Sequence, residues 1–405
     1  MSSYATAAVP SVKLGSRLSG LDALRGAVMI LMALDHVRDF LHVGAMSFSA
    51  TDLSKTTPLL FFTRWITHFC LPTFMFTAGA GAFLWWRQNN RSQRQLSRFL
   101  WTRGIWFVFL ELTVMQLAYD FRVSLRYPIL LLVLWIFGIC MIAMAALVRL
   151  PMPGLLGFSV AVIVFHNCLD GISAARFGAA AWLWNLLHQP GFIAGNTVLV
   201  TYTLLPWIGV MAGGFCFGRI LLLDPPRRQR IMRRIGSASI VAFIALRAVN
   251  RYGDPAHWSF QKGPLFTFLS FLNCSKYPAS LDFLLMTLGP ALLVLAWLDR
   301  IPLSRGNPFV VFGRVPMFYF ILHLYLIHLV TVIMALLRYG TAAFSFAFNP
   351  VPSMGGPAKL FPANFGYGLL TVYGIWIMIL VLLYPLCRWF AKIKSTHRSW
   401  WLSYL

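Results

Sequence analysis

Long apolar runs separated by charges, proline and glycine dominate the pattern of residues along the chain. A helix needs roughly 20 apolar residues to cross a bilayer, and most of these runs approach that length. They predict membrane-spanning helices at residues 20–42, 58–86, 99–119, 127–149, 153–170, 197–223, 235–250, 281–299, 309–338 and 366–391. We therefore expect an all-α, polytopic integral membrane bundle of about ten transmembrane helices.

The basic residues predict which loops face the cytoplasm, because lysine and arginine are retained on that side. An even number of helices places both termini there. The longer loops at 44–57, 171–196, 251–280 and 339–365 hold fewer cations and are expected on the outer side. The cytoplasmic positions are then Lys13, Arg17, Arg25, Arg87, Arg91, Arg94, Arg98, Arg227, Arg228, Arg230, Arg233, Arg234, Arg300, Arg305, Arg388, Lys392, Lys394 and Arg398.

The same pattern divides the chain into three parts. Residues 1–19 form a cytoplasmic N-terminal segment whose polar, small residues predict no cleavable signal. Residues 20–391 form a single transmembrane domain, and residues 392–405 form a basic cytoplasmic tail. We expect a multi-pass protein of the cell membrane, either a plasma membrane or an inner membrane.

Composition excludes a soluble globular protein. Of the 405 residues, 59% are hydrophobic and 11% are charged, against about 25% charged in soluble domains, and the mean hydropathy is +0.72. The formal net charge of +23 fits retention of cations beside anionic lipid, so we expect the lipid bilayer and not nucleic acid as the charged partner. The six cysteines lie in apolar stretches without metal-ligand spacing, and no metal site is expected.

The run at 20–42 holds the densest set of ionisable residues of any predicted span. Asp22 and Arg25 are three residues apart and can pair near the cytoplasmic end, where a structural salt bridge would also explain them. Asp35, His36, Arg38, Asp39 and His42 follow towards the outer half. Charges inside a membrane are costly and mark candidate functional sites.

Spacing within this group suggests a general base. His36 and Asp39 are three residues apart on a helix, and Asp35 and Asp39 share a face. A carboxylate beside a histidine fixes its tautomer and stabilises the imidazolium. The alternative is that Arg38, Asp39 and His42 form only the solvated outer end of the helix, with Arg38 and Asp39 simply paired.

Further ionisable residues occur in later apolar runs. Arg64 and His68 are four residues apart, so they share a face, and His68 is expected at a depth comparable with His36. Lys276 is the cation nearest the outer end of the run at 281–299, where it could simply extend to the interface. His323 and His328 are five residues apart and face different directions, so at least one should only bond another helix.

Four motifs in order resemble a known family. They are Leu21-Asp22-Ala23-Leu24-Arg25-Gly26 with Asp35-His36 about ten residues on; Leu71-Pro72-Thr73-Phe74-Met75-Phe76-Thr77-Ala78-Gly79; Ser275-Lys276-Tyr277-Pro278; and Gly313-Arg314-Val315-Pro316 with His323. Together they span roughly residues 17–335 and resemble the heparan-alpha-glucosaminide N-acetyltransferase-like proteins of the transmembrane acyltransferase group.

The resemblance implies an enzyme that moves an acetyl group from cytoplasmic acetyl-CoA to an amine or hydroxyl of an extracytoplasmic sugar or glycan. It implies His36 as base, Asp35 or Asp39 as its orienting group, and His68 as a second base or oxyanion partner. Arg25 and Arg314 would contact the CoA phosphates. Lys276, Tyr277 and His323 would contact the acceptor.

Two questions stay open at this stage. The lysosomal member of the family has asparagine about where His36 stands and its catalytic histidine beyond the first span, so His36, His42 and His68 are alternative bases. A proton-coupled transporter or flippase would also use buried aspartates and histidines, and a silent scaffold is a third reading. Oligomeric state is open, with a homodimer as one option.

Overall fold

The structure is a computed structural model that describes residues 18–88, 90–121, 128–397, 399 and 402, and most of these are helical. The α-helices are α1 (Ser19–Leu41), α2 (Pro58–Trp65), α3 (Cys70–Gln88), α4 (Gln93–Leu110), α5 (Gln116–Asp120), α6 (Val133–Leu147), α7 (Met152–Phe165), α8 (Ala181–Leu187), α9 (Leu204–Phe217), α10 (Pro225–Val249), α11 (Pro264–Leu272), α12 (Leu281–Leu298), α13 (Pro308–Arg314), α14 (Pro316–Tyr339) and α15 (Leu369–Thr396). The strands are β1 (Ile129–Leu131), β2 (Gly191–Ile193) and β3 (Val198–Val200).

Six helical stretches in the described part of the chain are long and apolar enough to cross a membrane: Pro58–Gln88, Met152–Leu169, Leu204–Leu222, Leu281–Leu298, Pro316–Ser345 and Leu369–Thr396. The prediction of a helical membrane protein is therefore confirmed, and about ten spans stays a prediction. The run at 127–149 yields the shorter apolar helix Val133–Leu147. The predicted spans at 20–42, 99–119 and 235–250 fall on α1, α4 with α5, and α10, which are helical but carry more charges.

Several predicted spans differ from the helices observed, and 309–338 and 235–250 are two of them. The interval 309–338 is two helices, because Val315, with φ −130° and ψ 51°, separates α13 from α14. A proline disfavours helical geometry in the residue before it, and Pro316 follows Val315 here. The interval 235–250, expected to be short, belongs to the 25-residue helix α10, which begins at Pro225.

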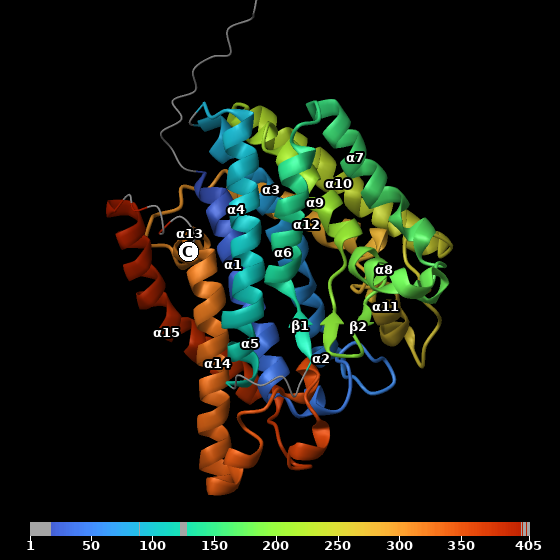
Figure 1. Ribbon diagram of the computed structural model, residues 1–405, viewed down its shortest axis with the longest axis vertical. Coiled ribbons are helices and arrows are strands. Elements are labelled where there is room, and N and C mark those ends of the chain that lie inside the picture. Colours follow the sequence, from blue (N-terminus) through green and yellow to red (C-terminus); the bar gives the residue numbers. More distant parts are fainter. Residues whose placement is uncertain (1–17, 89, 122–127, 398, 400–401, 403–405) are drawn as a thin grey trace, which may run out of the picture.

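A small three-stranded sheet interrupts the all-α pattern. Strand β1 pairs in parallel with β3, with Ile129 opposite Val198, and β2 pairs antiparallel with β3. Its strands are three residues long and lie inside or beside apolar runs, where periodicity cannot separate a strand from a helix. In Figure 1 the sheet lies below α6 and α9, at the lower end of the bundle.

Helix α1 is held in the centre by close helix crossings. A Cβ at Gly26 would lie 1.8 Å from the Phe309 carbonyl oxygen of α13, and one at Gly313 would lie 1.7 Å from the Asp22 carbonyl oxygen. Gly79 of α3 meets α9 in the same way. Small residues allow backbones to approach this closely, so glycines of three of the motifs fix the helices around α1.

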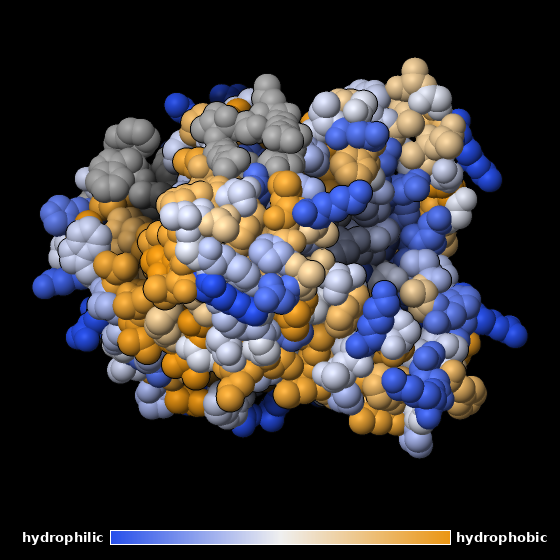
Figure 2. All heavy atoms as spheres, turned by 90° about the horizontal axis from the view of Figure 1, so that it is seen from below, coloured by the Kyte–Doolittle hydropathy of each residue, from blue (hydrophilic) through white to orange (hydrophobic). Residues whose placement is uncertain are grey.

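The two ends of the bundle differ in character. Helix α1 begins and α15 ends in the upper part of Figure 1, near the start of α4, while the loops that follow α1 and α14 lie at the bottom. Figure 2 shows that lower end, where hydrophilic side chains surround a recess and hydrophobic ones cover much of the flank. The start of α1 and the end of α15 thus lie at one end, and its assignment to the cytoplasm stays a prediction.

Candidate active site

The second half of α1 carries a network of ion pairs. Arg38 donates to Asp35 at 2.9 Å and to Asp39 at 2.7 Å. Arg64, from α2, donates to the other carboxylate oxygen of Asp35. Asp35 and Arg38 are buried, and pairing offsets the cost of burying their charges. The pairing of Arg38 with Asp39 is therefore confirmed, but Arg38 is buried and not solvated. In the described residues both aspartates bond to arginine and not to His36.

His36 contacts a second histidine instead. Its Nδ1 lies 2.7 Å from Nε2 of His323 on α14, and the two rings stack with centroids 4.9 Å apart. His323 Nδ1 lies 3.0 Å from the Tyr319 carbonyl oxygen. A carbonyl only accepts, so His323 carries its proton on Nδ1 and its Nε2 accepts from His36 Nδ1. The hydrogen-bond pattern therefore leaves the lone pair of His36 on Nε2.

His36 opens onto a cavity of about 640 Å³ that we call the histidine cavity. Its polar lining includes Asp35, Asp39 and Arg64 beside His36. The remaining wall comes from residues of loops, strands and helices far apart in sequence: Arg38, 45–50, Tyr119, Leu130, Leu132, Val133, Leu199, Thr201, Tyr202, Lys276, Tyr277, Phe320, 352–356 and Ala358. A base with a free lone pair thus faces a space large enough for a sugar.

The other candidate bases lie elsewhere. His42 is buried beyond the end of α1, and its Nδ1 accepts from the Gly44 backbone N–H at 3.0 Å. His68 is 3% exposed and packs against Phe283. Neither of these histidines lines the histidine cavity. Among the three alternatives, the structure brings only His36 to it.

Lys276 and Tyr277 reach the cavity from a firmly anchored loop. Asp254 accepts from the Ser275 backbone N–H at 2.7 Å and from the Ser280 hydroxyl at 2.6 Å. The Tyr277 hydroxyl lies 3.3 Å from that of Tyr202. Enclosure raises the pKa of Tyr277, but the charges of Lys276 and Arg64 outweigh it and lower the pKa below its usual value.

Arg247 of α10 secures the same loop from behind. It is 1% exposed and donates to the carbonyl oxygens of Ala256, Ser270, Phe271 and Asn273. Asp254 and Asp282 lie 3.9 Å and 4.0 Å from its guanidinium. The loop that carries Lys276 and Tyr277 is therefore held by a buried cluster of charged side chains around Arg247. This cluster gave no clear signal in the sequence.

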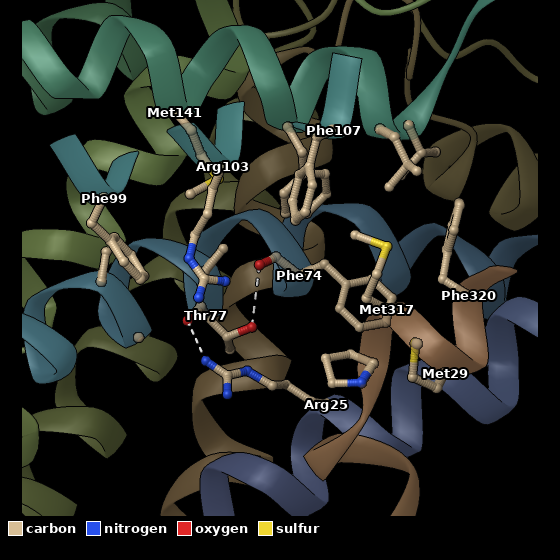
Figure 3. Close-up of a pocket in the computed structure, with 17 residues that line it drawn as sticks. Arg25, Met29, Phe74, Thr77, Phe99, Arg103, Phe107, Met141, Met317 and Phe320 are labelled. Carbon is tan, nitrogen blue, oxygen red and sulfur yellow. Dashed lines mark hydrogen bonds between the residues drawn. The ribbon is translucent and has the colours of Figure 1, made fainter. Parts of the chain in front are cut away.

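Arg25 belongs to a second, more apolar space of about 260 Å³, the arginine pocket. Arg25 donates to the Thr77 carbonyl oxygen at 2.6 Å, and its guanidinium lies 3.7 Å from Asp22. Figure 3 shows Arg103 of α4 pointing towards Arg25 at one end of the pocket, with Met29 and Phe320 at the other. The rest of the lining is Phe74, Thr77, Ala78, Gly81, Ala82, Phe99, Phe107, Val133, Leu134, Phe137, Met141, Pro316 and Met317.

Arg314 and His323 line neither of the two spaces, although the resemblance assigned them to the CoA phosphates and to the acceptor. Arg314 ends α13 and is not among the residues of the arginine pocket, while Arg103, which no motif contains, is. His323 is fully buried behind His36 and lines neither space. Hence His323 reaches the site indirectly, through its contacts with the rings of His36 and Phe320.

The arginine pocket and the histidine cavity meet. Phe320 and Val133 line both of them. The two spaces therefore share a wall close to His36, because the ring of His323 stacks on His36 and also lies 5.6 Å from the ring of Phe320. A ligand entering each space would bring its reactive end to this shared wall.

Some buried ionisable groups serve the fold. His328 lies between the carbonyl oxygens of Ala118 and Ala347, at 2.9 Å and 3.1 Å, which confirms that one histidine of α14 only bonds other segments. Glu111 accepts from the backbone N–H groups of Leu134 and Trp135 at 2.7 Å and 3.1 Å and so caps α6. A lone acid in an apolar run was its signal in the sequence.

Comparison with known proteins is consistent with this arrangement. The search of curated proteins found no match. The family described as heparan-alpha-glucosaminide N-acetyltransferase, catalytic, matches residues 17–251, which is more than half of the chain. That stretch contains Arg25, His36 and Arg64, whereas Lys276 and His323 lie beyond it. The chain therefore belongs to the heparan-alpha-glucosaminide N-acetyltransferase family, whose members are membrane acetyltransferases.

Proposed function

We propose that the protein transfers an acetyl group from acetyl-CoA, held in the arginine pocket, to an amine or hydroxyl of a sugar in the histidine cavity. The wall that the two spaces share at Phe320 and Val133 is the observation that carries the proposal. With the arginine pocket towards the cytoplasm, the acceptor would be extracytoplasmic. The transporter alternative gains no support from the family.

Acetyl-CoA is a substrate whose chemistry fits the arginine pocket. Arg25 and Arg103 offer planar donors for phosphate or pyrophosphate oxygens at one end. The apolar lining beyond them suits a pantetheine arm and thioester, and the acetyl end would reach Phe320. Arg314, outside this lining, is proposed only as a more distant phosphate contact.

His36 is proposed as the general base. Its Nε2 lone pair faces the histidine cavity, since Nδ1 donates to His323. His323 takes the orienting position that a carboxylate holds in a serine-protease triad. Asp35 and Asp39, tied to arginines, would instead set the charge around the acceptor.

The proposed step is direct transfer. His36 Nε2 accepts the proton of the acceptor N–H or O–H as that atom attacks the thioester carbonyl carbon. The carbon–sulfur bond breaks, CoA leaves as its thiolate, and His36 returns the proton to sulfur. Atoms and charge balance, and no acetyl-histidine is required. Arg64, which lines the cavity, would favour the negative charge that develops on the carbonyl oxygen.

Calorimetry of acetyl-CoA binding to the detergent-purified protein tests the donor assignment. Wild type and His36→Ala should bind with similar affinity, whereas Arg25→Ala should bind about tenfold more weakly. Arg98→Ala, which removes an exposed arginine of α4 outside the pocket, is the matched control. If folded wild type did not bind acetyl-CoA, the proposal would be wrong and the proton-coupled transporter would become the preferred hypothesis.

A further inference from the structure

A third space, beside the histidine cavity, is lined by residues that acetyl transfer does not explain. This side chamber, of about 280 Å³, is lined by Ser49, Thr51, Arg64, His68, Ala256, Asn273, Cys274, Ser275, Lys276 and Tyr277. Arg64, Lys276 and Tyr277 also line the histidine cavity. A molecule bound in the cavity could therefore extend a substituent into the side chamber.

The side chamber carries positive charge without a facing carboxylate. Arg64 and Lys276 line it, and no aspartate or glutamate does so. Arg64 forms an ion pair with Asp35, whereas Lys276 forms no ion pair in the described part of the chain. The Lys276 ammonium lies 5.3 Å and 5.9 Å from the ring centres of Tyr277 and Tyr202. Lys276 is partly buried, and a partly buried ammonium without an ion pair favours an anionic ligand.

His68 adds an unused hydrogen-bonding group. The residue is 3% exposed and lines the side chamber. Within the described residues, its Nδ1 has no hydrogen-bond partner. Buried polar atoms are nearly always bonded, so an unbonded one indicates a missing ligand or water. The depressed pKa of the Tyr277 phenol, caused by Lys276 and Arg64, reports the same positive field.

We propose that the side chamber is an oxyanion site, in which Lys276, Arg64 and His68 hold a carboxylate, sulfate or phosphate group. We further assign that group to the acceptor, because the shared wall lets one molecule occupy the cavity and the chamber together. This second statement rests on the proposed acetyl transfer, and the first does not.

Sulfate binding tests the site without any acetyl donor. Thermal unfolding of the purified protein would be followed by tryptophan fluorescence while sulfate replaces chloride at constant ionic strength. Wild type should show a saturable rise in Tm, and Lys276→Gln should bind sulfate at least tenfold more weakly. Lys262→Gln is the matched control, since Lys262 lies against Phe266 outside the chamber. The same sulfate response in Lys276→Gln and wild type would overturn the site.

His68→Phe provides a second variant in case Lys276→Gln does not fold. Phenylalanine keeps the ring against Phe283 and removes Nδ1. Sulfate should then bind several-fold more weakly. A wild type that responds to sulfate as it does to chloride would also reject the oxyanion site, whatever the variants do.

Kinetics distinguish an acceptor-borne anion from a free one. With an amino sugar that carries a carboxylate or sulfate, Lys276→Gln should raise KM at least tenfold. With a neutral amino sugar, which offers Lys276 no anion, the rise in KM should be much smaller. If Lys276→Gln changed KM by the same factor for both sugars, the acceptor assignment would be rejected. The sulfate measurement would still decide whether the oxyanion site exists. Failure of acetyl transfer itself would leave the sulfate result intact.

Discussion

The arginine pocket and the histidine cavity share a wall, but the pocket has a mostly apolar lining and the cavity a more polar and charged one. The pocket is enclosed by regular helices, and its lining is aromatic and aliphatic except near Arg25, Arg103 and Thr77. The cavity has charged groups and tyrosines, and much of its wall comes from loops and strand ends. Helices hold one shape and suit an invariant donor, while loops vary and suit a particular acceptor. Under the proposed function, acetyl transfer would take place at the boundary between the two.

Replacing His36 should have the largest effect. His36→Gln keeps a polar side chain but removes the Nε2 base, so the acetyl-transfer rate should fall by about 10²–10⁴-fold. Acetyl-CoA binding, which we propose for the arginine pocket, should be unchanged. Radiolabelled acetyl transfer and calorimetry on the same preparation measure both. His42→Gln should retain transfer, because His42 does not line the cavity. A fully active His36→Gln would reject His36 as base.

His323 should come next, because it acts through His36. His323→Leu removes the acceptor of the His36 Nδ1 proton, so kcat should fall about 10–100-fold, the usual cost of losing an orienting partner. His323→Gln places an amide oxygen near the same position and should recover much of the rate. The pH dependence of kcat should shift in the leucine variant and return in the glutamine variant.

His328 is the control for that experiment, as a buried histidine of the same helix. Its hydrogen bonds run to Ala118 and Ala347, away from the site. His328→Leu should lower thermal stability and leave the pH profile of the folded enzyme unchanged. If both leucine variants altered the pH profile equally, the positioning role of His323 would be wrong.

Much of the fold was predictable because bilayer thickness imposes long apolar runs, and helices occupy most of each predicted interval. The site was less predictable. The cluster from Asp35 to His42 was visible within one run, but its partners are remote: Arg64 is 29 residues from Asp35, and His323 is 287 residues from His36. Single-sequence spacing reports neighbours on one helix only. Arg103 and Tyr119 carried no motif, and only packing brings them to the two spaces.

The arginine pair should give a smaller, donor-specific effect. Arg103→Ala should weaken acetyl-CoA binding about tenfold, or about 1.4 kcal/mol, because one charged phosphate contact is lost. The kcat at saturating acetyl-CoA should stay close to wild type, and KM for the acceptor should not change. Steady-state kinetics with each substrate varied in turn would measure this. A changed acceptor KM would show that the pocket and cavity are not separate binding sites.

The smallest expected effect lies at the shared wall. Phe320 is 6% exposed and separates an apolar pocket from a polar cavity. Phe320→Leu thins this barrier, so water from the cavity should reach the thioester and acceptor-independent hydrolysis of acetyl-CoA should rise about two- to fivefold. Phe318→Leu is the matched control, because Phe318 stacks on Phe390 of α15 with ring centroids 4.3 Å apart and lines neither space. Free thiol release measured without acceptor reports the leak. Equal rates in the two variants would mean that Phe320 does not separate donor from water, and the boundary would have to be sought at Val133.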